Sequence, residues 1–153
     1  ADVIKGKKYD IYPKKIQKGI LFHRRVDSLT DQNEELKLLK KKLYPAVGKY
    51  AGVVIDIYLD HVLAKYWTGF SDMTLNAFTK KSHETLIKGL PLMPWISKYI
   101  FIRMFLGNWL ASYEHFYGFE SAIKGMSYRP RVKRSLLPSV AVIKENKRLF
   151  CVS

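Results

Sequence analysis

The chain has 153 residues, of which 48% are hydrophobic and 26% charged, so it has the composition of one folded domain and not that of a disordered protein. Lysine and arginine number 27 against 13 acidic residues, and the formal net charge of +14 favours an acidic partner, unless it marks only a solvated surface. The single cysteine, Cys151, excludes an internal disulfide framework, and no apolar stretch is long enough to span a membrane, so we expect a cytoplasmic protein.

The first half of the chain predicts three helices. After a polar start that ends at Pro13, apolar residues recur at helical spacing over residues 14–29 and again over residues 31–43. Residues 44–67 carry apolar side chains on more than one face, which is typical of a central and largely buried helix.

The second half predicts further helices at residues 71–88, 96–113, 119–125 and 133–150, the last bent or broken at Pro138. Strand-like alternation is absent beyond a few residues. The sequence therefore predicts an all-α protein whose residues 1–153 form a single helical-bundle domain. Aromatic residues at helical spacing are expected in its core: Trp95, Trp109, Tyr113, Phe116 and Tyr117.

Imidazole and carboxylate groups gather in two of the predicted helices. His23 and Asp27 are four residues apart, as are Asp56 and Asp60, and residues four apart share one helix face. Asp31 continues the first series if that helix persists. Because Asp56 and Asp60 interrupt an apolar helix, and a buried charge is costly, something must neutralise them.

Two kinds of counter-charge are available. One is a divalent metal held together with His23 and Asp27, and the other is a salt bridge from Arg24 or Arg25. Arginine forks bind phosphate, so a metal beside them would suit phosphoester hydrolysis, although neighbouring helical residues point about 100° apart and both arginines would not reach one phosphate. Arg129 lies in a basic loop and is either a phosphate contact or solvated. His83, His115 and the lysine run 40–42 are expected to be surface or structural residues.

These residues resemble two signatures of the bacterial acyl carrier protein phosphodiesterase family. Residues 23–31 read HRRVDSLTD, and residues 50–64 read YAGVVIDIYLDHVLA and are followed by Trp67. The opening ADVIKG, residues 109–113, Gly118 and residues 125–129 are similar to further family patterns. The similarity extends over nearly the whole chain.

The resemblance implies a metal-dependent phosphodiester hydrolase that removes 4′-phosphopantetheine from holo acyl carrier protein, with a fold distantly related to the HD-domain phosphohydrolases. The implied metal is Mn²⁺, with Mg²⁺, Fe²⁺ or Zn²⁺ as alternatives. The acidic carrier protein agrees with the basic charge, so neither nucleic acid nor a membrane is expected as partner. The implied metal site comprises Asp2, His23, Asp27, Asp60 and His61, and the implied catalytic residues are Arg24, Arg25, Asp31, Asp56 and Arg129.

The chain also departs from the family. An Asn-Phe-Leu-Ala-His stretch that usually precedes the ADVIKG-like segment has no counterpart, and the family usually continues past the position of Ser153. We therefore expect a natural N-terminal segment, and further C-terminal residues, beyond the numbered chain. Two alternative functions remain: an HD-type hydrolase acting on nucleotides, and a non-catalytic basic helical module that binds an acidic partner.

Overall fold

The computed structural model describes residues 4, 6, 8–95, 97–99, 102, 109–130 and 132–146. Every regular element within these residues is a helix, which confirms the all-α prediction. The elements are η1 (Lys8–Ile11), α1 (Lys14–Gln32), α2 (Glu34–Val47), η2 (Gly48–Tyr50), α3 (Ala51–Lys65), η3 (Trp67–Gly69), α4 (Leu75–Gly89), η4 (Leu90–Leu92), α6 (Trp109–Ser112), α7 (Phe116–Ser127) and α8 (Pro138–Glu145).

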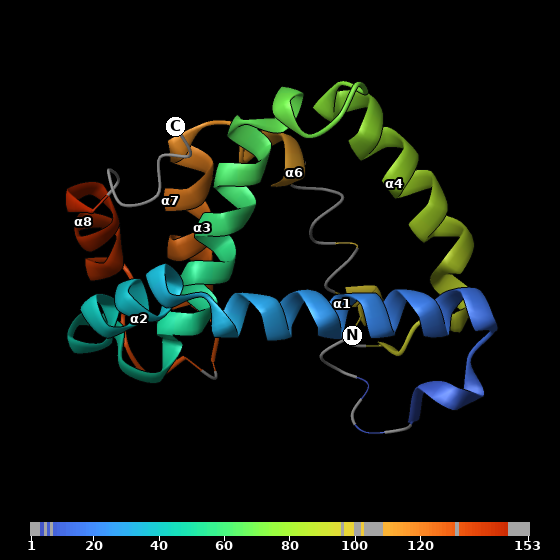
Figure 1. The fold of residues 1–153 in the computed structure, drawn as a ribbon, viewed down its shortest axis with the longest axis horizontal. Helices are drawn as coiled ribbons and strands as arrows, with labels where there is room; N and C mark the ends of the chain where they lie inside the picture. The colour runs from blue at the N-terminus through green and yellow to red at the C-terminus, as the bar shows by residue number, and fades with distance from the viewer. Residues whose placement is uncertain are drawn as a thin grey trace.

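The core lies where α2, α3, α7 and α8 meet (Figure 1). On α2 the residues Leu39, Leu43 and Val47 recur every four positions and are completely buried, because this spacing places them in one stripe. The stripe faces α3, which is buried over much of its circumference as the sequence predicts. Phe119 on α7 and Ile143 on α8 complete the core.

Two short junctions set the directions of the first three helices. Asn33 ends α1 and caps α2, because its side-chain Oδ1 accepts a hydrogen bond from the backbone N–H of Leu36 at 2.9 Å. Gly48 ends α2 with φ at +59°, a left-handed conformation that glycine adopts without steric penalty. The chain then turns through η2 directly into α3.

Several helix boundaries differ from the sequence prediction. Tyr44 and Pro45 belong to the last turns of α2, so the helix expected over residues 44–67 is shorter and begins after Gly48. The helix expected from residue 71 begins instead after Thr74, whose Oγ1 accepts a hydrogen bond from the Ala77 N–H. The final helix begins at Pro138 rather than containing it, since proline fits the first helical position.

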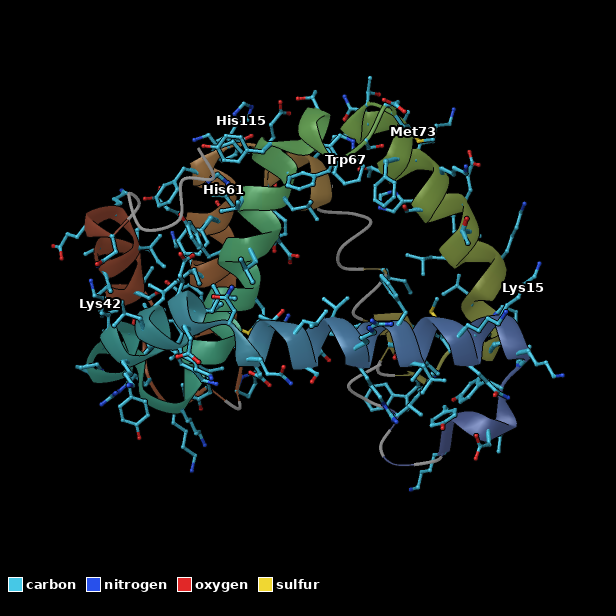
Figure 2. The ribbon with its side chains drawn as sticks, viewed as in Figure 1. Lys15, Lys42, His61, Trp67, Met73 and His115 are labelled. Carbon is cyan, nitrogen blue, oxygen red and sulfur yellow. The ribbon has the colours of Figure 1, made fainter. Side chains whose placement is uncertain are left out.

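The remaining boundaries concern the C-terminal half. Helix α7 extends on both sides of the predicted 119–125 segment and passes through Gly125. Half of the residues in the helix expected over residues 96–113 lie outside the described residues. The loop between α3 and α4 is closed by Trp67, whose indole Nε1–H donates to the Met73 carbonyl at 2.6 Å (Figure 2).

The aromatic residues expected in the core divide into two groups. Tyr113 is buried and Phe116 packs against the core, as predicted. Trp95 and Tyr117 are solvent-exposed, which contradicts the prediction, because helical spacing identifies a shared face without showing what covers it. The side chain of Trp109 lies outside the described part. Among the described helices, none has both the length and the apolar composition needed to cross a membrane.

Gly118 is the tightest glycine position in the core, and substitution there should destabilise the protein. A Cβ at Gly118 would overlap the carbonyl group of Ser112, which is backbone and cannot rotate away. We expect Gly118→Ala to lower the free energy of unfolding by about 1–3 kcal/mol, as overpacking does. Gly125→Ala, in the same helix but with no atom within 4 Å of the added carbon, is the matched control and should be neutral or slightly stabilising. Denaturant titration of both variants measures the difference, and equal stability would contradict the packing argument.

Candidate active site

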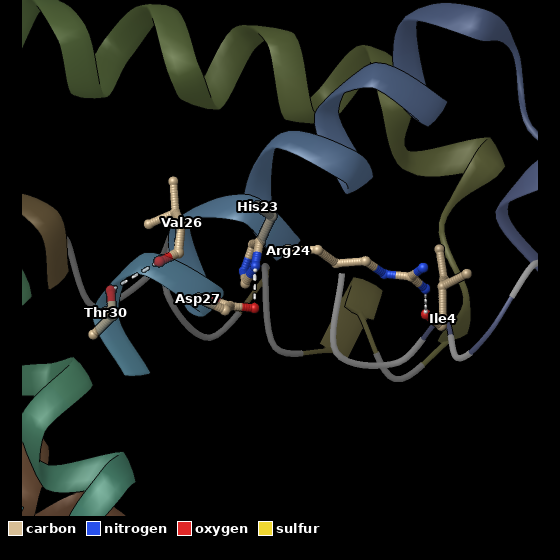
Figure 3. A network of polar contacts seen from close by, with 6 residues as sticks. All are labelled: Ile4, His23, Arg24, Val26, Asp27 and Thr30. Atoms are coloured by element: carbon tan, nitrogen blue, oxygen red, sulfur yellow. Dashed lines mark hydrogen bonds and ion pairs between the residues drawn. The ribbon is translucent and has the colours of Figure 1, made fainter. Parts of the chain in front are cut away.

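One polar face of α1 carries His23, Asp27 and Asp31 at successive turns. The Nδ1–H of His23 donates to Asp27 Oδ2 at 2.9 Å, with both side chains about half exposed (Figure 3). This contact confirms that His23 and Asp27 project together. The helix persists through Gln32, so Asp31 continues the same series. One turn further on, Asp31 Oδ1 is 3.9 Å from the ammonium of Lys40 on α2.

Arg24 points away from this pair and contacts the start of the chain. Its Nη2 donates to the carbonyl oxygen of Ile4 at 2.7 Å (Figure 3). It also donates to the carbonyl oxygen of Gly6 at 2.9 Å, and the guanidinium lies 5.1 Å from the ring centre of Tyr9. Arg24 therefore anchors the N-terminal segment to α1 in this arrangement. Arg25 is exposed and makes no hydrogen bond or ion pair within the described part of the chain.

Asp56 and Asp60 lie on the exposed side of α3, whereas their neighbours Ile55 and Ile57 are buried. The expectation that these aspartates are buried within an apolar helix is thus corrected, because α3 turns one narrow polar strip outward. Burial by surrounding protein atoms raises the pKa of the Asp60 carboxyl to about 6, and the negative charge of Asp56 adds to this rise. Since residue Asp60 as a whole is exposed, water still screens the outer side of its carboxyl.

His61 follows Asp60 in sequence but faces the core. It is only 5% exposed, and its Nδ1–H donates to the backbone carbonyl of Tyr113 at 2.6 Å. The imidazole meets the ring of Phe116 edge-on at 5.5 Å (Figure 2). His61 therefore joins α3 to the segment between α6 and α7, on a different side of α3 from Asp60.

The Tyr113 hydroxyl lies close enough to Asp60 and Arg129 for both charges to act on its pKa. Burial and the negative charge of Asp60 raise this pKa, the positive charge of Arg129 lowers it, and the result is a pKa of about 12. Both charges therefore act on the same hydroxyl. The sequence predicted Tyr113 only as a core residue. Tyr113 also belongs to residues 109–113, which resemble a family pattern, and this resemblance could have marked it as a neighbour of Asp60.

A small cavity unites parts of the two signatures. Its volume is about 50 Å³, and it lies between the end of α1, the middle of α2 and the first turns of α3. Asp31 and Asp56 both line it. The other lining residues are Thr30, Leu36, Lys37, Lys40, Gly52 and Ile55. Lys40, predicted to lie in a solvated lysine run, is exposed as expected, and it also lines this cavity, which no spacing pattern indicated.

The described residues do not assemble a complete metal centre. No group of three or more His, Cys, Asp or Glu side chains among them is placed to hold a metal ion. No described hydrogen bond or ion pair connects His23 or Asp27 to α3, and Asp2 lies outside the described residues. Asp31 on α1 and Asp56 on α3 meet at the cavity, but these two carboxylates do not fit a metal ion without further ligands.

Comparison with known proteins identifies relatives over most of the chain. The family model for acyl carrier protein phosphodiesterase matches residues 1–151. A protein of Enterobacter sp. (strain 638) named acyl carrier protein phosphodiesterase is 31% identical over 136 residues, which cover 86% of this chain and 69% of that protein. Proteins of the same name from Klebsiella pneumoniae (strain 342) and Escherichia coli O6:H1 are 29% and 30% identical over 136 residues, with the same coverage. No solved structure matches the chain.

The raised pKa of Asp60 predicts a pH-dependent stability. A carboxyl whose pKa rises from 3.8 to about 6 on folding binds its proton more tightly in the folded state, so the residue destabilises the fold progressively as pH rises from 3.8 to about 6. Asp60→Asn should therefore gain stability over the wild type across this window, by about 1 kcal/mol or 2–4 °C at pH 7.5 after allowance for solvent screening.

Thermal melting between pH 3.5 and 7.5, in buffer with chelator to remove bound metal, measures this gain. Asp72→Asn serves as control, because Asp72 is an exposed aspartate in the loop before α4. A stability difference between wild type and Asp60→Asn that stays constant over the whole range would contradict the interpretation.

Proposed function

Because the chain belongs to the acyl carrier protein phosphodiesterase family, we propose that it hydrolyses the phosphodiester linking 4′-phosphopantetheine to a serine of holo acyl carrier protein. The match over residues 1–151 carries this proposal. The net charge of +14 supports it, since a strongly basic protein attracts an acidic protein substrate. We place the reaction in the cytoplasm, where a single unpaired cysteine stays reduced.

The proposed reaction takes place beside the cavity that α1, α2 and α3 line, along the exposed face of α3 that carries Asp56 and Asp60. A water oxygen forms a bond to phosphorus, the bond from phosphorus to the serine oxygen breaks, and the serine oxygen receives a proton. The products are apo acyl carrier protein and 4′-phosphopantetheine. Asp60 is our candidate for the acceptor of the water proton, because a carboxylate with a pKa of about 6 is a stronger base than an ordinary aspartate and is still ionised at neutral pH. Asp56 lies one turn away and lines the cavity.

We further propose that activity requires a divalent metal ion, with Mn²⁺ as first candidate. When bound, such an ion would supply positive charge to the phosphate oxygens. Asp27 and His23 are already hydrogen-bonded to one another, an arrangement in which a carboxylate can orient an imidazole. No catalytic step is assigned to the ion, because the described residues do not form a three-ligand group.

Removal of single carboxylates tests the proposed site. Asp27→Ala and Asp60→Ala should each reduce the release of 4′-phosphopantetheine from holo acyl carrier protein by at least about 100-fold, because each removes a group from the reacting region. Both side chains are exposed, so circular dichroism should show an intact fold. Asp72→Ala is the control and should retain full activity. Wild-type activity in both site variants would refute the site, and equal hydrolysis of a panel of nucleotides would refute the substrate.

Metal removal tests the second part of the proposal. Dialysis against excess chelator should abolish phosphopantetheine release, and added Mn²⁺ should restore it, if the ion supplies charge that the protein's own residues lack. Elemental analysis of the purified protein provides a readout that does not depend on turnover. Full activity in chelator, with no metal found, would show that the hydrolysis needs no ion.

A further inference from the structure

A phosphodiester carries a negative charge, so a site that binds it needs a cation or several hydrogen-bond donors. The sequence points to Arg24 and Arg25 for this role. The Arg24 guanidinium, however, donates to the carbonyl oxygens of Ile4 and Gly6. Neither arginine lines the cavity that Asp31 and Asp56 share. The cations that do line it come from α2.

Lys37 and Lys40 are these cations, and their ammonium groups are differently engaged. Lys37 Nζ donates to Glu34 Oε1 at 2.7 Å on the exposed surface of α2. Lys40 Nζ is 3.9 Å from Asp31 Oδ1, which is beyond hydrogen-bonding distance. No described acceptor lies within hydrogen-bonding reach of Lys40, so its three N–H donors remain available to a ligand.

The end of the Lys40 side chain lies beside Gly52 in the first turn of α3. A Cβ placed on Gly52 would lie 3.9 Å from Lys40 Cε and 4.0 Å from its Nζ, which is ordinary van der Waals contact. The lysine side chain therefore runs from α2 to the first turn of α3. This path carries the ammonium from α2 to the space between Asp31 on α1 and Asp56 on α3.

We propose that Lys40 binds a non-bridging oxygen of the substrate phosphate at this cavity. The inference rests on the proposed function for the identity of the substrate, but the ligand chemistry is that of any phosphate ester or inorganic phosphate. A lysine ammonium is a compact point charge that binds phosphate without demanding bidentate geometry.

The carboxylates in the cavity do not exclude an anion. The side chain of Asp31 is 77% exposed, so water screens much of its repulsion for a phosphate. Hydrolysis also needs both signs of charge in one place, because a cation must hold the phosphate while a carboxylate accepts a proton from water. Lys40 supplies the cation at this cavity, and Asp56, which also lines it, lies one helical turn from Asp60, the proposed proton acceptor.

The neighbouring lysines provide matched controls. Lys41 is the next residue of α2, is exposed and does not line the cavity, because adjacent helical residues point about 100° apart. Lys42 Nζ donates to Asn146 Oδ1 at 2.6 Å, at the start of the loop after α8 (Figure 2). Lys40→Ala and Lys41→Ala therefore remove the same charge from the same helix, and only the first removes it from the cavity.

The first measurement is the binding of inorganic phosphate to the full chain, by isothermal titration at constant ionic strength. We expect Lys40→Ala to raise the Kd at least about 5-fold, Lys41→Ala to change it by less than about 2-fold, and Lys40→Arg to restore most of the affinity. Undetectable binding by the wild type, or equal weakening in the two alanine variants, would overturn the proposal. This measurement does not require turnover, so it stands even if phosphopantetheine release is never observed.

The second measurement is steady-state release of 4′-phosphopantetheine from holo acyl carrier protein. Lys40→Ala should lower kcat/KM by about 10- to 100-fold, with Lys40→Arg partly restoring it and Lys41→Ala close to wild type. Unchanged kcat/KM in Lys40→Ala, with an active wild type, would overturn the role of Lys40 in the reaction. Phosphate binding that depends on Lys40 in a wild-type protein without hydrolase activity would refute the proposed function and support the phosphate site.

Discussion

The packing of α2 against α3 is the constraint on which the rest of the structure depends. Leu39, Leu43 and Val47 are completely excluded from water, and burial of such side chains contributes about 1.5–3 kcal/mol each. The same packing holds the first turns of α2 beside those of α3, and together with the end of α1 they line the cavity. The lining includes the apolar residues Leu36 and Ile55, so the packing of α2 against α3 also places Lys40 and Asp56.

The charged residues and histidines of the two signatures fall into two groups, those on exposed helix faces and those that contact the rest of the protein. His23, Asp27, Asp31, Asp56 and Asp60 all lie on exposed helix faces, where they remain accessible to ligand and solvent. Arg24 and His61, although each adjoins one of these residues in sequence, turn to the protein itself and bind backbone carbonyls. Consecutive residues of one helical signature therefore face two surfaces, one exposed, for which we propose the chemistry, and one that contacts the rest of the protein.

The sequence predicted the helical class, the central position of α3 and the pairing of His23 with Asp27, because all three follow from spacing along a single helix. It placed the end of this helix at residue 43 instead of Val47, since the left-handed turn at Gly48 leaves no periodic signal. It also predicted that Lys40 is solvated, which its exposure confirms, but not that Lys40 lines a cavity beside Gly52. That contact joins α2 to another helix, and no pattern within one segment predicts it.

The angle between α1 and α2 is set at Asn33. This one residue both terminates α1 and caps α2, and of the nineteen residues in α1 only Ile20 is buried. At a rise of about 1.5 Å per residue, His23 stands roughly 15 Å from this pivot, and a rotation of about 10° there would displace it by about 2–3 Å. Asp31, next to the pivot, would hardly move. The distance from His23 and Asp27 to α3 is therefore more sensitive to the angle of α1 than the separation of Asp31 and Asp56 is.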